Sequence, residues 1–170
     1  MRKTCIIEAP SNLGLKEPEP GKEPGVKKLP AWFQQHGLYE KLKVKKLITV
    51  DPPPYSMNLD EASGVRNADA IAGYSKKLSP QINHAVSEGY FPVVIGGDCS
   101  ILIGCAHALK QKGKFGLFFI DGHTDFVMPH TSLTHGAAGM DLAIVSGHGH
   151  KKLTDIDHLE PYCEERHILA

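Results

Sequence analysis

Two short polar motifs each follow an apolar run, and their residue types could do chemistry. The first is Gly-Gly-Asp-Cys-Ser at 96–100, and the second is Asp-Gly-His-Thr-Asp at 121–125. In the second motif Asp121, His123 and Asp125 alternate along the chain, so an extended backbone would turn all three side chains to one face. Two carboxylates and an imidazole held together are costly to bury, and a divalent cation removes that cost. The spacing therefore predicts a metal site.

Each motif also has a purely structural interpretation. Asp121 could cap a turn in a polar loop, and Asp98 or Ser100 could cap a helix that begins near Ile101. The two glycines at 96–97 allow a tight turn and a close approach of the backbone. The presence of both motifs favours the metal site, with Asp98 either as a cap or as a hydrogen-bond partner of a ligand.

Buried strands and helices alternate along the chain and would position the two motifs. Apolar runs predict strands at 4–7, 46–50, 91–95 and 115–120, and the start of another at 167–169. Helical spacing and end signals predict helices at 30–37, 67–88, 101–112 and 136–145. This alternation is typical of parallel βαβ units. Because one crossover helix separates the motifs, the ends of their strands should lie side by side at one edge of the sheet.

Length and charge narrow the class of protein. The 170 residues predict a single domain, 1–170, and 19 basic against 19 acidic residues argue against a nucleic-acid partner. No run approaches the roughly 18 apolar residues of a membrane span, and the run at 5–7 is too short for a signal peptide. The four cysteines show no paired short spacing. We therefore expect a soluble cytoplasmic protein with reduced thiols.

The chain resembles the arginase/agmatinase/formiminoglutamase (ureohydrolase) superfamily over essentially its whole length. The segments that carry the resemblance are APSNLGL, PGVKKLPAWFQQHGL, GGDCS, DGHTDF and GMDLAIVSGHG. The resemblance implies an α/β fold, a three-layer α/β/α sandwich with a parallel sheet. It also implies a hydrolase that cleaves a guanidino or formimino C–N bond of a linear amidine. The nucleophile would be a hydroxide bound to two manganese ions.

The resemblance also assigns roles to residues of the second motif. Asp121, His123 and Asp125 would be metal ligands, and Cys99 stands where the family usually has a histidine ligand. A thiolate is softer than an imidazole, so Cys99 would make zinc a possible metal beside manganese. The alternative for Cys99 is a buried thiol that binds no metal.

The resemblance points to two candidate catalytic residues, Asp125 and His135. The family commonly has a proton-transferring histidine just before the Gly-Met of the next helix, and Ala138 occupies that position here. His135 lies three residues earlier and is the substitute candidate. Its alternative is an ordinary loop histidine.

One departure from the family is larger than the others. The family supplies two further carboxylate ligands from a downstream Ser-x-Asp-x-Asp strand end, and nothing after residue 125 matches it. Asp155 and Asp157 have the Asp-x-Asp spacing but lack a preceding apolar strand. His148 and His150 fit a glycine-rich turn. The chain thus looks like the N-terminal half to two-thirds of such a hydrolase, truncated at its C-terminus, with a weakened second metal site.

Three functions stay open on the sequence alone. The first is a family hydrolase acting on a small guanidino or formimino substrate. The second is a catalytically inactive family member that serves as a scaffold or subunit partner. The third is a mononuclear zinc site formed by Cys99, Asp121, His123 and Asp125. A homo-oligomer is compatible with the first two, because a sheet that lacks its later strands exposes an apolar edge.

Overall fold

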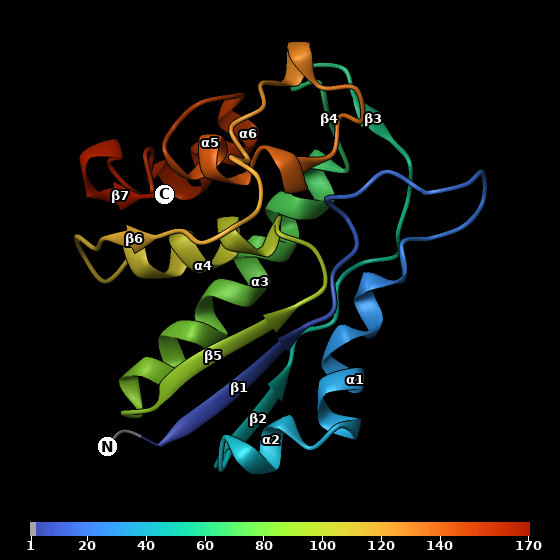
Figure 1. Cartoon of the computed structure of the whole chain (residues 1–170). Helices are drawn as coiled ribbons and strands as arrows, with labels where there is room; N and C mark the ends of the chain where they lie inside the picture. Colours follow the sequence, from blue (N-terminus) through green and yellow to red (C-terminus); the bar gives the residue numbers. More distant parts are fainter. Residues whose placement is uncertain (1–2) are drawn as a thin grey trace.

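A three-stranded parallel sheet is the main sheet of the molecule. The computed structural model describes residues 3–170, and its main sheet has the order β2-β1-β5 (Figure 1). Its strands are β1 (Thr4–Ala9), β2 (Lys46–Thr49) and β5 (Phe91–Gly96). The central strand β1 aligns Ile7 with Ile48 of β2 and with Val94 of β5. The strands predicted at 4–7, 46–50 and 91–95 are confirmed.

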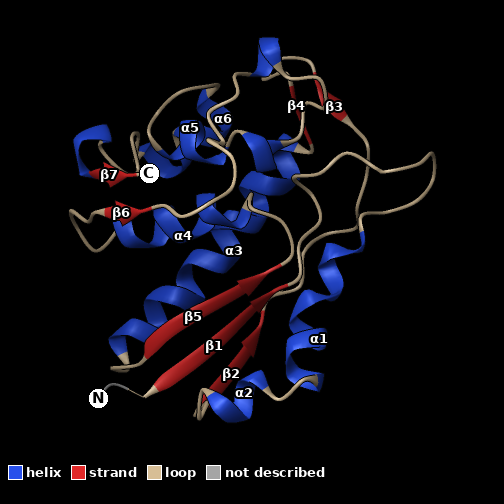
Figure 2. Cartoon of the chain, viewed as in Figure 1, coloured by secondary structure: helices blue, strands red, loops and turns tan. Residues whose placement is uncertain are grey.

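Helices cover both faces of this sheet, as Figure 2 shows. One face carries α1 (Leu29–Gln35) and α2 (Leu38–Lys41), and the other carries α3 (Ala68–Ser87), against which α4 (Ile101–Lys110) packs. Alternate residues of β1 serve the two layers. Ile7 packs in a core with Tyr74 and Leu78, whereas Ile6 packs in a separate core with Tyr39. The predicted three-layer α/β/α sandwich is confirmed.

The long helix α3 is the crossover that returns the chain to β5. Its buried residues recur on one face, as the apolar spacing predicts. It packs closely against α4 at Gly104, where an added Cβ would lie 3.1 Å from the Leu78 side chain and from the Ser75 backbone. The carboxyl end of β5 therefore leads into a helix that packs closely against α3.

Shorter elements make up the rest of the chain. Two small sheets pair β3 (Leu59–Asp60) with antiparallel β4 (Val65–Arg66), and β6 (Leu117–Phe118) with parallel β7 (Ile168–Leu169). Two short α-helices follow, α5 (Asp141–Val145) and α6 (Lys151–Thr154). Single 3-10 turns cover Gly25–Lys28, Pro129–Thr131, Ala137–Gly139, Ile156–His158 and Glu165–His167. In residues 3–170 we find no helix of the length and hydropathy needed to cross a membrane.

Two predictions about the second half of the chain need correction. The predicted buried strand at 115–120 is only the two-residue β6, which pairs with β7 and not with β5. It is not buried either, because no described element covers its outer face: Phe118 is 66% exposed and Ile120 is 82% exposed. The helix predicted at 136–145 is instead a 3-10 turn followed by α5. The strands that precede the two motifs are thus not neighbours in one sheet.

Candidate metal centre

The turn after β5 places the first motif. Gly97 donates its N–H to the Ala9 carbonyl at 3.2 Å, and the next residue, Asp98, donates to the Ser11 carbonyl at 3.1 Å. A Cβ at residue 97 would lie 1.9 Å from the Ser11 carbonyl oxygen. Only glycine allows this contact with the chain leaving β1. This contact fixes the position of the backbone from which the Asp98 and Cys99 side chains project.

Asp98 holds the turn from inside. Its Oδ1 accepts the Ser100 N–H at 2.9 Å, whereas the Ser100 side chain makes no capping hydrogen bond to α4. Of the two predicted caps, Asp98 is therefore the one that bonds the backbone. Asp98 is buried, and its Oδ2 has no hydrogen-bond partner among the described residues. An unpartnered buried carboxylate oxygen is costly and marks a place where a cation or donor would be stabilising.

The second motif is a turn, not the extended run that the alternating pattern predicts. Asp121 Oδ1 accepts the His123 N–H at 2.9 Å, and Asp125 has a left-handed backbone with φ of 45°. The turn still gathers the three side chains, because ligand atoms of Asp121, His123 and Asp125 all lie within 4.8 Å of one another. The prediction that they converge is met, but by a different backbone.

A second group of ligand atoms joins the two motifs through a residue outside both. Atoms of Cys99, Asp125 and Asp141 also lie within 4.8 Å of one another. Asp141 begins α5 and is 1% exposed, and α5 is tied to the second motif by the Ala143 N–H, which donates to the Asp125 carbonyl at 3.3 Å. Asp125 therefore belongs to both groups. The turns after β5 and β6 meet here although the two strands do not pair.

Sequence analysis missed Asp141. A signal was present, since this carboxylate stands inside the apolar run Gly-Met-Asp-Leu-Ala-Ile-Val at 139–145. A charged residue in such a run is rarely buried without a partner. The apolar residues of this run predict a helix, and Asp141 is the one charged residue that interrupts them.

The buried carboxylates disfavour their own charge. Burial, and next the charge of Asp125, raises the pKa of Asp141 to about 8. Burial and the charge of Asp121 raise the pKa of Asp125. Partial burial of the sulfur and the charges of Asp141 and Asp125 raise the pKa of Cys99 to about 11, although residue 99 as a whole is exposed. This concentration of anionic donors fits a divalent cation, which would favour the charged form of each.

The donor types differ between the two groups. The Asp121, His123 and Asp125 group offers oxygen and imidazole ligands, which suit manganese. The group with Cys99 contains a thiol, which suits zinc and other thiophilic metals. A cavity of about 490 Å³ adjoins Asp121 and His123, and aromatic rings of Phe119 and Phe126 line it. The arrangement can hold cations beside a space large enough for a small molecule.

His135 lies elsewhere. It lines a separate cavity with Gly64, His130 and His150, and its Nδ1 is 2.9 Å from the Gly64 carbonyl oxygen. The neighbouring Ala138 is buried and donates its N–H to the Gly14 carbonyl at 3.0 Å. The structure thus does not bring His135 to the other predicted site residues, and its catalytic role stays a prediction.

The remaining candidates have structural partners. Asp157 contacts Lys76 Nζ at 2.7 Å and His107 Nε2 at 3.1 Å. Its neighbour Asp155 Oδ1 accepts the Glu160 N–H at 3.2 Å. His148 contacts Glu165, and the His150 ring accepts the Lys152 N–H at the start of α6. Neither Asp155 nor Asp157 belongs to a described ligand group.

Comparisons with known proteins agree with one another. A family model described as the arginase family matches residues 2–159. An arginase of Staphylococcus aureus (strain COL) is 31% identical over 160 residues, which cover 89% of this chain and 51% of that protein. The native structure of Bacillus caldovelox arginase has a TM-score of 0.83 and 27% identity, over 99% of this chain and 56% of that one.

A further solved structure carries a bound molecule. An Entamoeba histolytica arginase in complex with L-ornithine has a TM-score of 0.80 and 25% identity, over 99% of this chain and 57% of that one. The chain thus spans about half the length of the relatives it matches.

Proposed function

Because the chain belongs to the arginase family, we propose that it is a metal-dependent hydrolase of a guanidino or formimino C–N bond. The observation that carries the proposal is that two groups of ligand atoms share Asp125, each within 4.8 Å. A carboxylate common to two groups suits a pair of cations, as two-metal hydrolytic sites require. The bound L-ornithine of the Entamoeba arginase makes arginine the first substrate to test.

We propose manganese for the centre and zinc as the alternative wherever Cys99 takes part. Asp121, His123 and Asp125 would hold one ion, and Cys99 with Asp125 would bind toward the other. Bound metal supplies Lewis-acid polarisation and a nucleophile at neutral pH. The charges of the second motif would favour a cationic guanidinium in the adjoining cavity, where the Phe119 and Phe126 rings offer faces for a planar cation.

Hydrolysis also needs a side chain that transfers a proton to the leaving amine. Burial and the charge of Asp121 raise the pKa of Asp125 in the metal-free chain, and a bound cation would favour its charged form again. We propose Asp125 as the catalytic carboxylate beside its ligand role. His135 would serve only if its ring gave up the Gly64 contact and moved out of its own cavity.

The second candidate function is an inactive family member that acts as a scaffold or subunit. Two observations favour it: Ala138 replaces the histidine expected from the resemblance, and His123 has an 86% exposed side chain. Self-association would use the outer edge of β5, which pairs with no other described strand, and the exposed Phe118 of β6. A cytoplasmic location is our proposal for either function, supported by four free cysteines.

The deciding experiment combines metal analysis with turnover. The purified chain is dialysed against manganese or zinc and its metal content is measured, and then arginine, agmatine and formiminoglutamate are tested as substrates. The hydrolase proposal predicts two ions and release of urea or formamide, both lost in Asp125→Asn. Two ions without turnover of any substrate would support the scaffold. One zinc ion per chain would support a mononuclear site, and no bound metal would exclude both metal-dependent functions.

A further inference from the structure

We infer that Asp141 is itself a metal ligand, completing a thiolate–carboxylate site with Cys99 and Asp125 for a thiophilic divalent cation. The inference rests on the proposed metal dependence and goes beyond it. It assigns a ligand from α5 that neither polar motif contains. It also predicts that the two halves of the centre prefer different metals.

The geometry of the three side chains carries the inference. They arrive from three separate segments: the turn after β5, the turn after β6 and the first residue of α5. Their ligand atoms nevertheless lie within 4.8 Å of one another. The only hydrogen bond that the described residues give to the Asp141 carboxylate is from the adjacent Leu142 N–H to Oδ1, at 2.8 Å. No lysine, arginine or histidine forms an ion pair with it in residues 3–170.

Burial separates this group from an ordinary acidic surface patch. Asp141 is 1% exposed and Asp125 is 7% exposed, so water does not solvate their charges. A buried carboxylate without a cationic partner is strongly unfavourable. Nothing in the fold of α5 requires a carboxylate here, because a neutral amide oxygen could also accept the hydrogen bond that the Leu142 N–H donates.

Asp98 gives an independent indication of a missing cation. It is 4% exposed, and its Oδ2 has no hydrogen-bond partner among the described residues. Asp98 lies close enough for its charge to act on both Cys99 and Asp141. An orphaned oxygen beside a group of buried acids is relieved by a cation or by a water bound to one.

The donor set defines the class of metal. One thiolate with carboxylate oxygens suits zinc or cobalt(II), with a further position for water or substrate. Binding would displace the Cys99 thiol proton to solvent, and any proton on Asp141 with it, so the step involves no oxidation or reduction. The imidazole-containing group around His123 would keep its preference for a harder cation such as manganese.

Cobalt(II) alone is the probe for the test, because its coordination by a thiolate produces a charge-transfer absorption band. The 170-residue chain should bind two Co²⁺ ions and develop the band. Asp141→Asn should bind one ion and need at least a tenfold higher Co²⁺ concentration for the band. Asp69→Asn is the matched control, since this exposed aspartate lies in α3 and belongs to neither ligand group.

Two further measurements guard against a merely structural effect. Metal-free Asp141→Asn should melt at a higher temperature than the parent chain, because a neutral amide replaces a buried acid whose ionisation is opposed by burial and by the charge of Asp125. A purely structural role for the carboxylate predicts a lower melting temperature. Asp141→Cys should restore the second ion with a stronger thiolate band, since it returns a ligand at the same position.

The outcomes separate this inference from the proposed function. If the parent chain binds two ions and Asp141→Asn keeps both with an unchanged band, the inference is wrong and the hydrolase proposal stands. The inference is also wrong if Asp141→Asn does not fold and Asp141→Cys folds without binding the second ion. If the parent chain binds no Co²⁺ or Mn²⁺, both the inference and the proposed metal dependence fail.

Discussion

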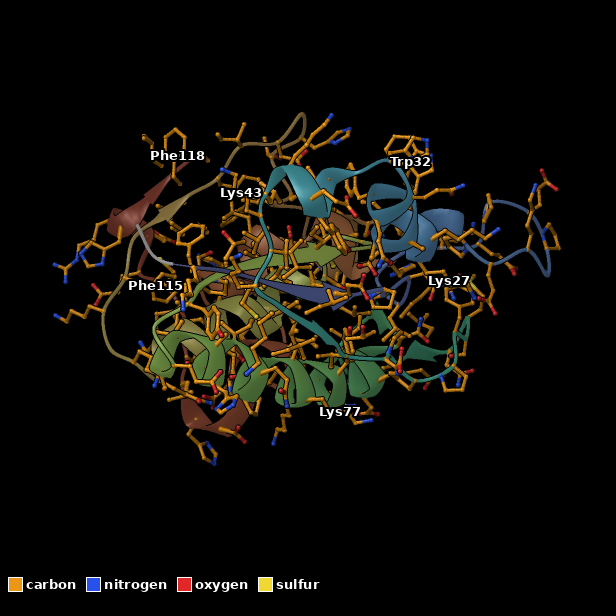
Figure 3. All side chains as sticks on the ribbon, turned by 90° about the horizontal axis from the view of Figure 1, so that it is seen from below. Lys27, Trp32, Lys43, Lys77, Phe115 and Phe118 are labelled. Atoms are coloured by element: carbon orange, nitrogen blue, oxygen red, sulfur yellow. The ribbon has the colours of Figure 1, made fainter. Side chains whose placement is uncertain are left out.

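Strand β1 and the segment around β6 are both apolar in sequence, but only β1 is buried in the structure. Both are short apolar runs that lead toward the candidate metal centre. β1 pairs on both edges and packs on both faces, and its Ile7 is fully buried. β6 pairs only with β7 among the described strands, and Ile120 just beyond it is 82% exposed. Figure 3 shows Phe118 at the periphery of the molecule.

This difference in burial explains what positions the two ligand groups of the candidate centre. One half contains Cys99, Asp125 and Asp141, and the other half adds Asp121 and His123. Cys99, Asp125 and Asp141 are positioned by packed elements, namely the Gly97 turn and α5. Asp121 and His123 lie on a solvent-exposed turn that follows β6. One half is therefore organised by the fold itself. The other half has only its own turn and, in our proposal, the bound cation to order it.

The sharpest test of the comparison is a matched pair of isoleucines. Ile7→Ala removes a fully buried side chain from the core and should lower the free energy of unfolding by about 2–5 kcal/mol. Ile120→Ala makes the same chemical change at an exposed position and should change it by less than about 0.5 kcal/mol. Urea unfolding followed by circular dichroism measures both. Comparable losses would show that residue 120 is buried in solution.

Asp125 links the two halves, so its removal should affect both. Asp125→Ala takes one ligand from each group of ligand atoms, and we expect neither ion to remain after dialysis. Elemental analysis of the dialysed protein measures this, with Asp69→Asn as the control that keeps both ions. Retention of a full ion in the Cys99 group would show that Asp125 is not shared.

His123 should separate metal binding from folding. His123→Ala should remove one ion, because the ring is the only imidazole in either ligand group. The melting temperature of the metal-free chain should stay the same, since 86% of the side chain is exposed and packs on little. Elemental analysis and thermal unfolding in a chelator test the two statements separately. A large drop in the melting temperature of the metal-free variant would show that the His123 side chain packs in the fold, and would contradict its placement on a solvent-exposed turn.

Asp141, in the buried half of the candidate centre, should make the unfolding free energy of the metal-free chain depend on pH. Because the pKa of Asp141 is raised to about 8, the folded state holds a proton that the unfolded state releases above about pH 4. This contribution to stability is complete below the unfolded pKa and is lost as pH rises toward 8, by at most about 1.4 kcal/mol per pH unit.

Comparison with Asp141→Asn isolates this contribution from other titrating groups, among them His107, whose pKa is lowered by burial. The difference in unfolding free energy between the parent chain and the variant, measured in urea at pH 5 to 8, should shift in favour of the variant as pH rises. A constant difference would show that Asp141 titrates normally.

Local patterns were enough to predict the sheet half of the fold. Continuous apolar runs mark β1 and β5, and the 3.6-residue spacing from Ile71 to Ile82 marks α3. These patterns succeed because both faces of the sheet are covered, so apolar residues and burial coincide. The same pattern wrongly predicts a buried strand at 115–120, because no described element covers the outer face of this apolar run.

The candidate site was predicted in part for a similar reason. Alternating polar residues identified Asp121, His123 and Asp125, and their convergence is met although the backbone is a turn. Asp141 was missed because its approach to Cys99 depends on where α5 docks, which no local pattern reports. The strand order was also beyond local patterns, since β6 pairs with a segment about fifty residues later in the chain.

The environments of the four thiols determine how readily the cysteines are oxidised or alkylated. Burial raises the pKa of Cys5, Cys99, Cys105 and Cys163, so each is protonated at neutral pH. Alkylating reagents and peroxide attack the thiolate, and at pH 7 a thiol with a pKa of about 11 is ionised in about one molecule in ten thousand. The metal-free chain should therefore keep its cysteines through long storage, and the exposed Cys99 should be labelled slowly by iodoacetamide.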